Sequence, residues 1–504
     1  MCGKKLNCLA GVIVYLFSVL FLILLLQGCV TQDGIDTKNP VPTITAISPN
    51  AKVSHYPSFT LTIEGKGFIE NSVILFNGVQ KQTEYVSATR LTCTINPADI
   101  TVVAPTATSD GLALPAQDQN MPVAVRNPSP GGGGSYPMTF TVRSNPVFST
   151  PIPLTSGNVS YYFPSLVVQD TGNVCLAYVY ADAINHVSAI DFIRSDANGT
   201  NWGTPVRIAQ APVGCYYPKI ALDNEGNINI VFFAVDRLYF ARSTTNGTTW
   251  STPVALSSVS DKNFEPAFAI DSAGGLNVIW PQWVDTVNSH ILFSRSTDKG
   301  VNWSVPINIY AGWLNSIEPS SPVIAVDSSG GIFTAWADLW WHHMYTESSL
   351  KSNYSLNNGL TWQNEDDDWG GGSHSSIAVH SDGVIYKTGA AVMMPHFYEI
   401  FCHKSEDRFT SWKNTADLPK KSKGYSPQLK IDRAGNLNVI YVIQSLCYFF
   451  RSQDGGATWT DEILITDDHA HSWSDFAMSL DQWGNIYMAY VYGDPTQIYF
   501  ISSK

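Results

Sequence analysis

Three carboxylates stand at corresponding places in the sequence, each close to the start of an apolar stretch typical of a β-strand. They are Glu265, Glu318 and Asp475. Two carboxylates that face each other at about 5–9 Å can divide the acid, base and nucleophile roles of a glycosidase. Spacing along the sequence does not give that separation. These residues are therefore the candidate catalytic residues only if the protein is an enzyme.

Aromatic residues and histidines accumulate in the same kind of segment. Ring faces stack on the C–H surfaces of sugars while neighbouring carboxylates bond the hydroxyls, so this composition predicts a ligand-binding groove. The alternative is that about half of these rings only fill space between neighbouring sheets. The candidate ligand-binding residues are Tyr162, Tyr217, Trp283, Trp313, Trp340, Trp341, His343, Trp369, His374, Tyr398, Tyr425 and Trp473.

Several histidines raise the question of a metal site. His342, His343, His374, His469 and His471 could hold a metal ion together with nearby aspartates. The His-x-His pattern puts both rings on one side of an extended strand, but it is common by chance. Surface histidines are the favoured interpretation, and the sequence predicts no metal and no cofactor.

These residues belong to the connections of a repeated unit of about 50 residues. Its first half is a strand, an Asp-x-x-Gly turn and a second strand. Its second half is a strand followed by Ser-x-Asp-x-Gly-x-x-Trp, complete at Ser296–Trp303 and Ser452–Trp459. Ser and Asp can bond N–H groups of the turn, Gly supplies positive φ, and Trp packs on apolar surface. The motif therefore indicates a structural clamp rather than catalytic or metal-binding aspartates.

The Ser-to-Trp motif resembles the Asp box, or BNR repeat, of sialidase-like β-propellers. The resemblance covers residues 144–504 and implies a ring of four-stranded blades. Seven copies of the first half predict seven blades, with six as the alternative. Strand 148–154 has the pattern of an outer strand and is predicted to complete the last blade. The family binds ligands on the face formed by the loops between second and third strands and by the crossovers between blades.

Sialidase activity is not expected from this sequence. A sialidase clamps the carboxylate of its substrate with three arginines. Here Arg194, Arg242, Arg295 and Arg451 directly precede the serine of an Asp box, which assigns them to the opposite face. Only Arg237 falls in a loop between second and third strands, so the arginine triad is missing.

An alternating, strand-like pattern also covers residues 41–143, ahead of the repeats. Stretches such as FTLTIEGKGFIENSVILFNG and RLTCTINPADI are separated by glycine-containing turns. They resemble an IPT/TIG immunoglobulin-like domain, which implies a spacer or protein-contact module without catalytic groups. The fold expected for the chain is all-β: an immunoglobulin-like sandwich followed by a β-propeller.

The N-terminal 28 residues have the pattern of an export signal, with two lysines before an apolar run that ends in Gly28-Cys29. The ending Leu-Gln-Gly-Cys resembles the bacterial lipobox, which implies lipidation of Cys29. Residues 29–40 are the predicted tether. An uncleaved signal anchor is the alternative. Val30, where lipoproteins retained at the inner membrane often carry Asp, favours the outer membrane or cell surface.

The composition fits an exported protein. Charged residues make up 14% of the chain, aromatic residues 12%, and the net charge is −13. Few charges and many aromatic residues are typical of extracellular all-β proteins, and an anionic surface repels nucleic acid. The widely spaced cysteines support no disulfide framework, and a Cys175–Cys215 bridge stays open.

Three functions follow from these patterns. The leading hypothesis is a lipid-anchored surface protein that binds a glycan or a surface protein through one propeller face, without catalysis. The second is a glycoside hydrolase or lyase acting on extracellular polysaccharide. The third is a scaffold in an envelope assembly. The expected partners are the membrane, through the lipid at Cys29, and the glycan or surface protein.

Overall fold

The computed structural model describes most of the chain after residue 37. The described residues are 38–53, 58–101, 119–143, 146, 148–197, 199–212, 214–258, 265–283, 289–311, 316–342, 345–363, 366–368, 372–393, 397–418, 424–443, 446–466 and 475–503, and inside some strands only the backbone is described. The predicted export signal at residues 1–28 and the predicted lipidation site Cys29 lie outside this part. The chain divides into two compact units, Met1–Asn145 and Pro146–Lys504.

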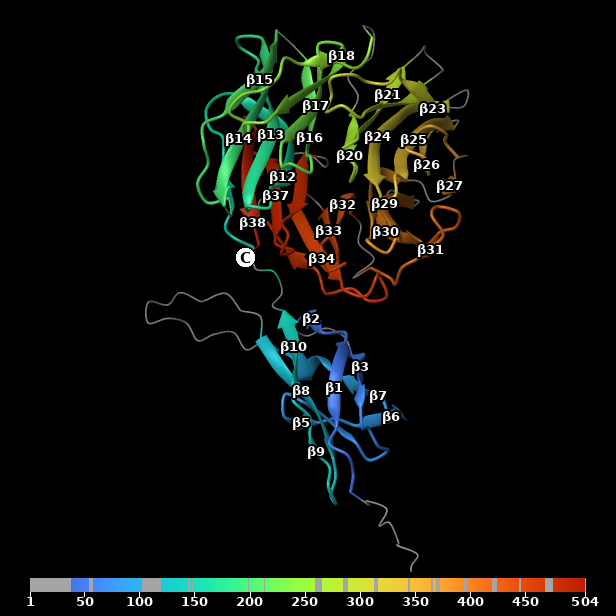
Figure 1. Ribbon diagram of the computed structural model, residues 1–504. Coiled ribbons are helices and arrows are strands. Elements are labelled where there is room, and N and C mark those ends of the chain that lie inside the picture. The colour runs from blue at the N-terminus through green and yellow to red at the C-terminus, as the bar shows by residue number, and fades with distance from the viewer. Residues whose placement is uncertain are drawn as a thin grey trace, which may run out of the picture. The chain divides into compact units, whose positions relative to one another are not determined.

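The first unit is a sandwich of two β-sheets (Figure 1). One sheet has the order β1 (Thr43–Ser48), β3 (Phe59–Lys66), β7 (Arg90–Ile95) and β6 (Thr83–Ser87). The other has the order β2 (Ala51–Val53), β10 (Met138–Arg143), β8 (Gln119–Asn127), β4 (Val73–Phe76) and β5 (Val79–Gln80), and β9 (Gly133–Gly134) pairs with β8. A 3-10 turn, η1, covers Pro97–Ile100.

The alternation of buried and exposed side chains along the strands explains why these two sheets face each other. Along β3 the side chains of Leu61 and Ile63 are fully buried, and along β8 those of Val123 and Val125 are fully buried, while the residues between them are more exposed. All four belong to one apolar core with Phe140. Because successive side chains of a strand point to opposite faces, each sheet contributes one buried face.

The second unit consists of four-stranded antiparallel sheets, which we call blades 1 to 7 in the described part of the chain. Each blade is named here from its inner to its outer strand. Blade 1 contains β12 (Ser160–Val168), β13 (Asn173–Asp182), β14 (Val187–Ala197) and β15 (Val206–Ala211), and blade 2 contains β16 (Cys215–Leu222), β17 (Ile228–Ala234), β18 (Arg237–Ser243) and β19 (Val254–Ala255). Blade 3 contains β20 (Ala267–Ile270), β21 (Leu276–Trp283), β22 (Ser289–Ser296) and β23 (Ile307–Ala311), and blade 4 contains β24 (Ser316–Val326), β25 (Ile332–His342), β26 (Tyr345–Ser355) and β27 (Asp366–Asp368). Blade 5 contains β28 (Gly372–Val379), β29 (Ile385–Met393), β30 (Phe397–Ser405) and β31 (Lys413–Asn414), blade 6 contains β32 (Tyr425–Ile431), β33 (Leu437–Ile443), β34 (Leu446–Ser452) and β35 (Ile463–Leu464), and blade 7 contains β36 (Phe476–Leu480), β37 (Ile486–Tyr492), β38 (Gln497–Ser502) and β11 (Ile152–Pro153).

The blades form a closed ring. Each inner strand contacts the inner strand of the next blade, in the order β12, β16, β20, β24, β28, β32 and β36, and β36 contacts β12 again. Figure 1 shows the sheets arranged radially around a central axis. The all-β prediction of a sandwich followed by a propeller is confirmed.

The ring is closed by the start of the unit pairing with its end. Ile152 pairs with Phe500 and Pro153 with Tyr499, and Phe148 forms an isolated bridge with Ser503. The backbone N–H of Leu154 donates to the carbonyl of Ile498 at 2.8 Å. This confirms that the segment 148–154 completes the last blade, so that the edge of β38 is paired.

The apolar core lies between adjacent blades. All seven residues of β17 are buried, because a blade inside the ring is covered on both faces. Cys175 and Phe192 of blade 1 pack against Ile220 and Ile228 of blade 2 in one cluster.

The Asp boxes clamp the hairpins between the third and fourth strands. In blade 3 the Ser296 hydroxyl accepts from the Gly300 N–H at 2.9 Å, and the Asp298 carboxylate accepts from the Asn302 N–H at 2.8 Å. Hydrogen bonds from the Asn302 N–H, the Asn302 side chain and the Ser296 hydroxyl hold the pKa of Asp298 below its usual range. Trp303 donates to the Gly300 carbonyl, and its ring meets Phe240 of blade 2 edge-on at 5.3 Å. The aspartate is therefore a turn clamp and the tryptophan a plug between blades.

Blade 1 departs from this motif in an informative way. Ala197 stands where the acid is expected, and Asp196, one residue earlier, accepts instead from the backbone N–H groups of Thr200 and Asn201. In blade 5, Phe409 stands in place of glycine, adopts a φ of 81° and is 3% exposed. Each of these two blades thus keeps its clamped turn, although one residue of the motif differs in each.

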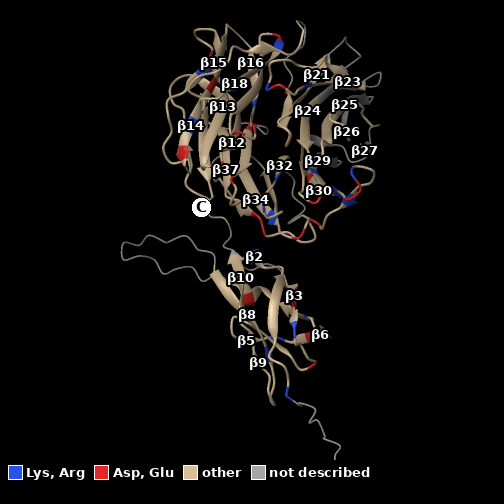
Figure 2. Ribbon diagram, in the orientation of Figure 1, with Lys and Arg blue, Asp and Glu red and all other residues tan. Residues whose placement is uncertain are grey.

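The arginines before the boxes contact the Asp-x-x-Gly turns. Arg242 lies 2.5 Å from Asp223, and Arg295 lies 2.7 Å from Asp271. Turns and boxes therefore share one end of the ring, as the sequence predicted. Acidic and basic residues occur together in the loops at the strand ends (Figure 2).

The described cysteines are free thiols. Cys175 and Cys215, the pair left open by the sequence, are both fully buried and unpaired by any disulfide. No helix in the described part of the chain is long and apolar enough to cross a membrane.

Candidate binding site in the central channel

The inner strands carry a repeated bulge at the end of the ring opposite to the boxes. Phe163, Tyr217, Ser321 and Ser426 have φ between 48° and 52°, and each precedes a proline of its inner strand. The pairing register shifts at the same places in β12, β16, β24 and β32. Proline donates no N–H and is tolerated in a sheet at such bulges. Positive φ costs an L-residue about 1–2 kcal/mol, so these positions are held by the surrounding structure.

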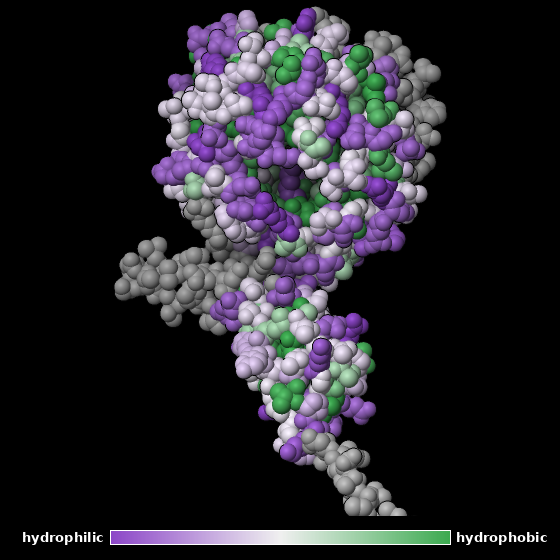
Figure 3. All heavy atoms as spheres, viewed as in Figure 1, coloured by the Kyte–Doolittle hydropathy of each residue, from purple (hydrophilic) through white to green (hydrophobic). Residues whose placement is uncertain are grey.

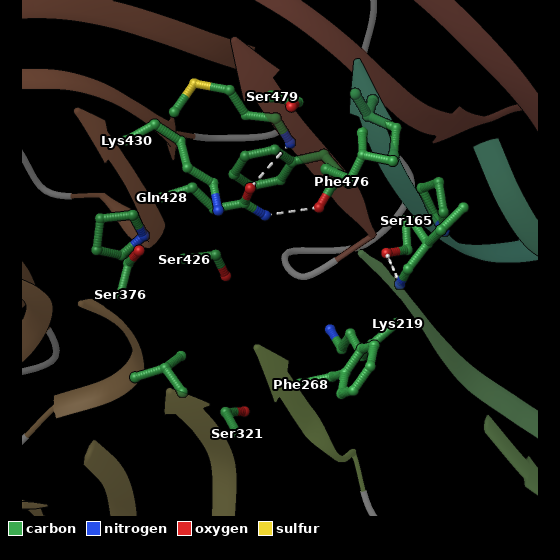
Figure 4. Close-up of a pocket in the computed structure, with 18 of the residues that line it drawn as sticks. Ser165, Lys219, Phe268, Ser321, Ser376, Ser426, Gln428, Lys430, Phe476 and Ser479 are labelled. Carbon is green, nitrogen blue, oxygen red and sulfur yellow. Dashed lines mark hydrogen bonds between the residues drawn. The ribbon is translucent and has the colours of Figure 1, made fainter. Parts of the chain in front are cut away.

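A cavity of about 410 Å³ runs along the axis of the ring, lined by all seven inner strands. Its opening appears as a hollow at the centre of the ring, with hydrophilic residues beside apolar ones (Figure 3). Polar and apolar side chains share its wall (Figure 4). The polar residues that line it are Ser165, Lys219, Glu265, Ser321, Ser375, Ser376, Ser426, Gln428, Lys430 and Ser479.

Some of these polar side chains connect one inner strand to the next. The Ser165 hydroxyl accepts from the Ile220 N–H at 3.1 Å, and the Ser376 hydroxyl accepts from the Leu429 N–H at 3.0 Å. Gln428 donates to the Phe476 carbonyl at 2.7 Å and accepts from Met478. Side chains therefore join blades where no backbone ladder runs, and they fix the wall of the channel.

Two lysines bring positive charge into the channel. Lys219 Nζ lies 2.5 Å from Glu265 Oε1. Lys430 has no ion-pair partner among the described residues. Its side chain is exposed to the channel, yet protein surrounds it, and this burial together with the charge of Lys219 lowers the Lys430 pKa below its usual value. A pKa shift of this sign and cause is typical of an ammonium group without a counter-ion.

Four aromatic rings stand just before the cavity-lining residues of β12 and β16 along the chain, and we call them the aromatic row; they do not line the cavity themselves, and three of them pack partly between blades. Its members are Tyr162 and Phe163 of β12 and Tyr216 and Tyr217 of β16, all partly exposed. The ring centroids of Phe163 and Tyr217 are 4.4 Å apart, those of Tyr162 and Phe163 6.1 Å, and those of Tyr216 and Tyr217 6.0 Å. The row therefore bridges two blades, and its two central rings belong to strained bulge residues.

The predicted carboxylates do not share one environment. Glu265 lines the cavity and pairs with Lys219. Asp475 is 6% exposed and does not line the cavity, so the structure does not bring its carboxylate to the channel surface beside Glu265. The backbone of Glu318 lies in β24, opposite Leu339, and its side chain is outside the described part.

The predicted ligand-binding residues divide into three groups. Tyr162 and Tyr217 lie in the aromatic row. Trp283, Trp340, Trp341, His374, Tyr398 and Tyr425 are described by their backbone alone, in β21, β25, β28, β30 and β32. Trp313, His343, Trp369 and Trp473 lie outside the described residues.

The candidate residues did not include Phe163, Lys219, Ser426 or Lys430. A signal for the first three was present, because each stands directly beside the proline of an inner strand. Lys430 had no such signal, since a lysine near the end of a strand is usually a solvated surface residue. Within the described part of the chain, no group of three or more His, Cys, Asp and Glu side chains could hold a metal ion.

Residues 42–142 match the IPT/TIG domain family. No curated protein matches the chain. Similar solved structures include a protein of unknown function from Dyadobacter fermentans, 16% identical with a TM-score of 0.45, covering 70% of this chain and 97% of its own. Others are an ulvan lyase, 10% identical, TM-score 0.45, covering 68% and 94%, and a Hadza microbial sialidase, 13% identical, TM-score 0.41, covering 92% and 97%. The chain thus consists of a TIG domain followed by a β-propeller.

Proposed function

We propose that this protein binds a glycan at the mouth of the propeller channel, without catalysis, as a lipid-anchored protein of the cell surface. The observation that carries the proposal is the aromatic row. Its four partly exposed rings form a continuous strip beside a polar cavity of about 410 Å³. A sugar presents C–H surfaces to such rings and hydroxyls to polar groups, and the row and channel supply both.

The strain in the row supports a binding role over simple packing. Ser321 and Ser426 occupy the same bulge position as Phe163 and Tyr217. The bulge therefore does not require an aromatic residue for folding. Large rings at two adjacent copies, in contact with each other and with water, are placed where a ligand can reach them.

A second candidate is a hydrolase or lyase on extracellular polysaccharide. Glu265 beside Lys219 in the channel wall is the observation that favours it, since a carboxylate and an amine can exchange protons with a substrate. Both functions predict glycan binding, and they differ in whether products appear.

The test is binding of the full chain, kept in a detergent without a sugar headgroup, to a panel of soluble oligosaccharides. We expect a subset to bind and no shorter or unsaturated products to form. Tyr217→Ser, which installs the residue found at this position in blades 4 and 6, should weaken binding. Tyr136→Ser removes a highly exposed ring from the other unit and serves as the control. Binding to no glycan contradicts the proposal, and product formation supports the enzyme instead.

The proposed anchor is a lipid on Cys29, with the protein at the outer membrane or cell surface. Cys29→Ser should remove acyl incorporation and release the chain from the membrane fraction after cell breakage. A Cys93→Ser variant is the control, because this thiol is buried in the first unit. Membrane retention of the unacylated Cys29→Ser variant would support the uncleaved signal anchor.

A further inference from the structure

We infer that the central channel binds the acidic group of an acidic glycan, a carboxylate or a sulfate, through Lys430 with Lys219 beside it. This inference rests on the proposed glycan binding and names its ligand class. The sugar rings would lie on the aromatic row while the acidic group enters the channel.

The charges in the described channel wall do not balance. Glu265 is engaged by Lys219 at 2.5 Å, so one carboxylate faces two ammonium groups. The net charge of the chain is −13, and the described part of the channel wall is thus locally cationic in an anionic protein. An anion placed there gains charge-assisted hydrogen bonds from ammonium groups that the fold already holds in position.

Two buried hydroxyls lie in the wall of the same channel. Ser426 is 5% exposed and Ser375, on the neighbouring inner strand, is 8% exposed, and the hydroxyl of each has no hydrogen-bond partner in the described part of the chain. Figure 4 shows the ends of Lys219 and Lys430 directed toward the open middle of the cavity. Buried hydroxyls are usually bonded, so both can donate to an acceptor that a small movement of the wall brings within reach.

The channel connects directly to the aromatic row. Lys219 follows Tyr217 by two residues in β16, and Ser165 follows Phe163 by two residues in β12. The two central rings and the channel wall are therefore two residues apart along both inner strands. The lowered pKa of Lys430 agrees with an ammonium group that lacks its anion.

The test uses matched pairs of oligosaccharides: oligogalacturonate with its carboxyl-reduced counterpart, and a sulfated galactan oligosaccharide with its desulfated counterpart. Affinity for the full chain is measured by calorimetry. We expect the acidic member of at least one pair to bind about tenfold tighter than its neutral counterpart, the size of one charge-assisted hydrogen bond. Which pair shows the preference distinguishes carboxylate from sulfate.

The variants separate this inference from the proposed function. Lys430→Gln should abolish the preference, so that the acidic member binds no tighter than the neutral member. Lys413→Gln, on the outer strand β31, makes the same charge change away from the channel and should keep the preference. Equal affinity for both members in the wild type overturns the inference while glycan binding stands. A preference that survives Lys430→Gln also overturns it, and binding to neither member overturns both.

Discussion

At the scale of single residues, the two lysines of the channel differ in their surroundings, because Lys219 pairs with Glu265 while Lys430 has no ion-pair partner in the described part of the chain. Tyr162 and Tyr217 could be predicted as ligand-binding candidates because both stand within two residues of the proline of an inner strand, in the segment that enters a blade. Lys430 could not, because nothing in its neighbourhood shows that the strand carrying it faces a channel. Only the closing of the ring puts it opposite Lys219. The burial of the candidate carboxylate Asp475 likewise depends on a packing that the sequence does not show, and its catalytic role stays a prediction.

The buried cysteines give a prediction at this scale. Burial raises the pKa values of the Cys175, Cys402 and Cys447 thiols to about 12. At pH 8 about one thiol in ten thousand would then be ionised, and the thiolate is the reactive form. Iodoacetamide should leave all three unmodified in the native protein and modify them in denaturant, as read by peptide mass spectrometry. Fast modification of the native protein would contradict the described burial, and a Cys175 that stays blocked in denaturant would indicate a disulfide.

At the scale of elements, the Asp box could be predicted with its mechanism. Ser296, Asp298 and Trp303 make the contacts expected from their types. The blades whose Asp box departs from the motif could not be predicted from the motif alone. Asp196 replaces the missing acid of blade 1 from a neighbouring position, which requires the turn to be seen in three dimensions. The bulges before the prolines were also missed, because a register shift leaves no mark in the alternation of one strand.

Substitutions at two glycines of blade 3 test whether its Asp box packs against blade 2. Gly300 in the Asp box has a φ of 88°, and a methyl group there would overlap the ring of Phe240. Gly300→Ala should lower the free energy of unfolding by about 3–5 kcal/mol, from positive φ and overpacking together. Gly274→Ala is the matched control, since its φ is 82° with nothing within 4 Å of the added carbon, and it should cost only about 1–2 kcal/mol. Equal losses in chemical denaturation would show that the box is not packed against blade 2.

At the scale of the whole molecule, the sequence predicted the order of the two folds and the closure between residues 148–154 and the chain's last strand. It could do so because the outer-strand pattern precedes the first repeat, while the last repeat ends one strand short. The sequence could not predict which side chains meet in the channel, because these come from strands more than 200 residues apart, such as β16 and β32.

Closure can be tested by replacing residues 148–154 with a Gly/Ser stretch of equal length. The replacement removes the pairing of Ile152 with Phe500 and the contact of Phe148 with Phe449. The side chains of Phe148 and Ile152 are partly buried, so their loss should cost the propeller at most about 1.5–3 kcal/mol of stability each. Thermal unfolding should therefore begin at a lower temperature. An unchanged midpoint would contradict a ring held shut by this segment.

The central claim is that the aromatic row binds glycan, and one affinity comparison tests it most directly. Calorimetry is performed with the tightest-binding glycan of the panel, on the wild type and on the double variant Phe163→Ser, Tyr217→Ser, with unfolding followed in parallel. We expect the dissociation constant to rise about 10- to 100-fold, as two ring contacts are lost, while the folded ring persists. An affinity that remains unchanged in a folded double variant would contradict the account.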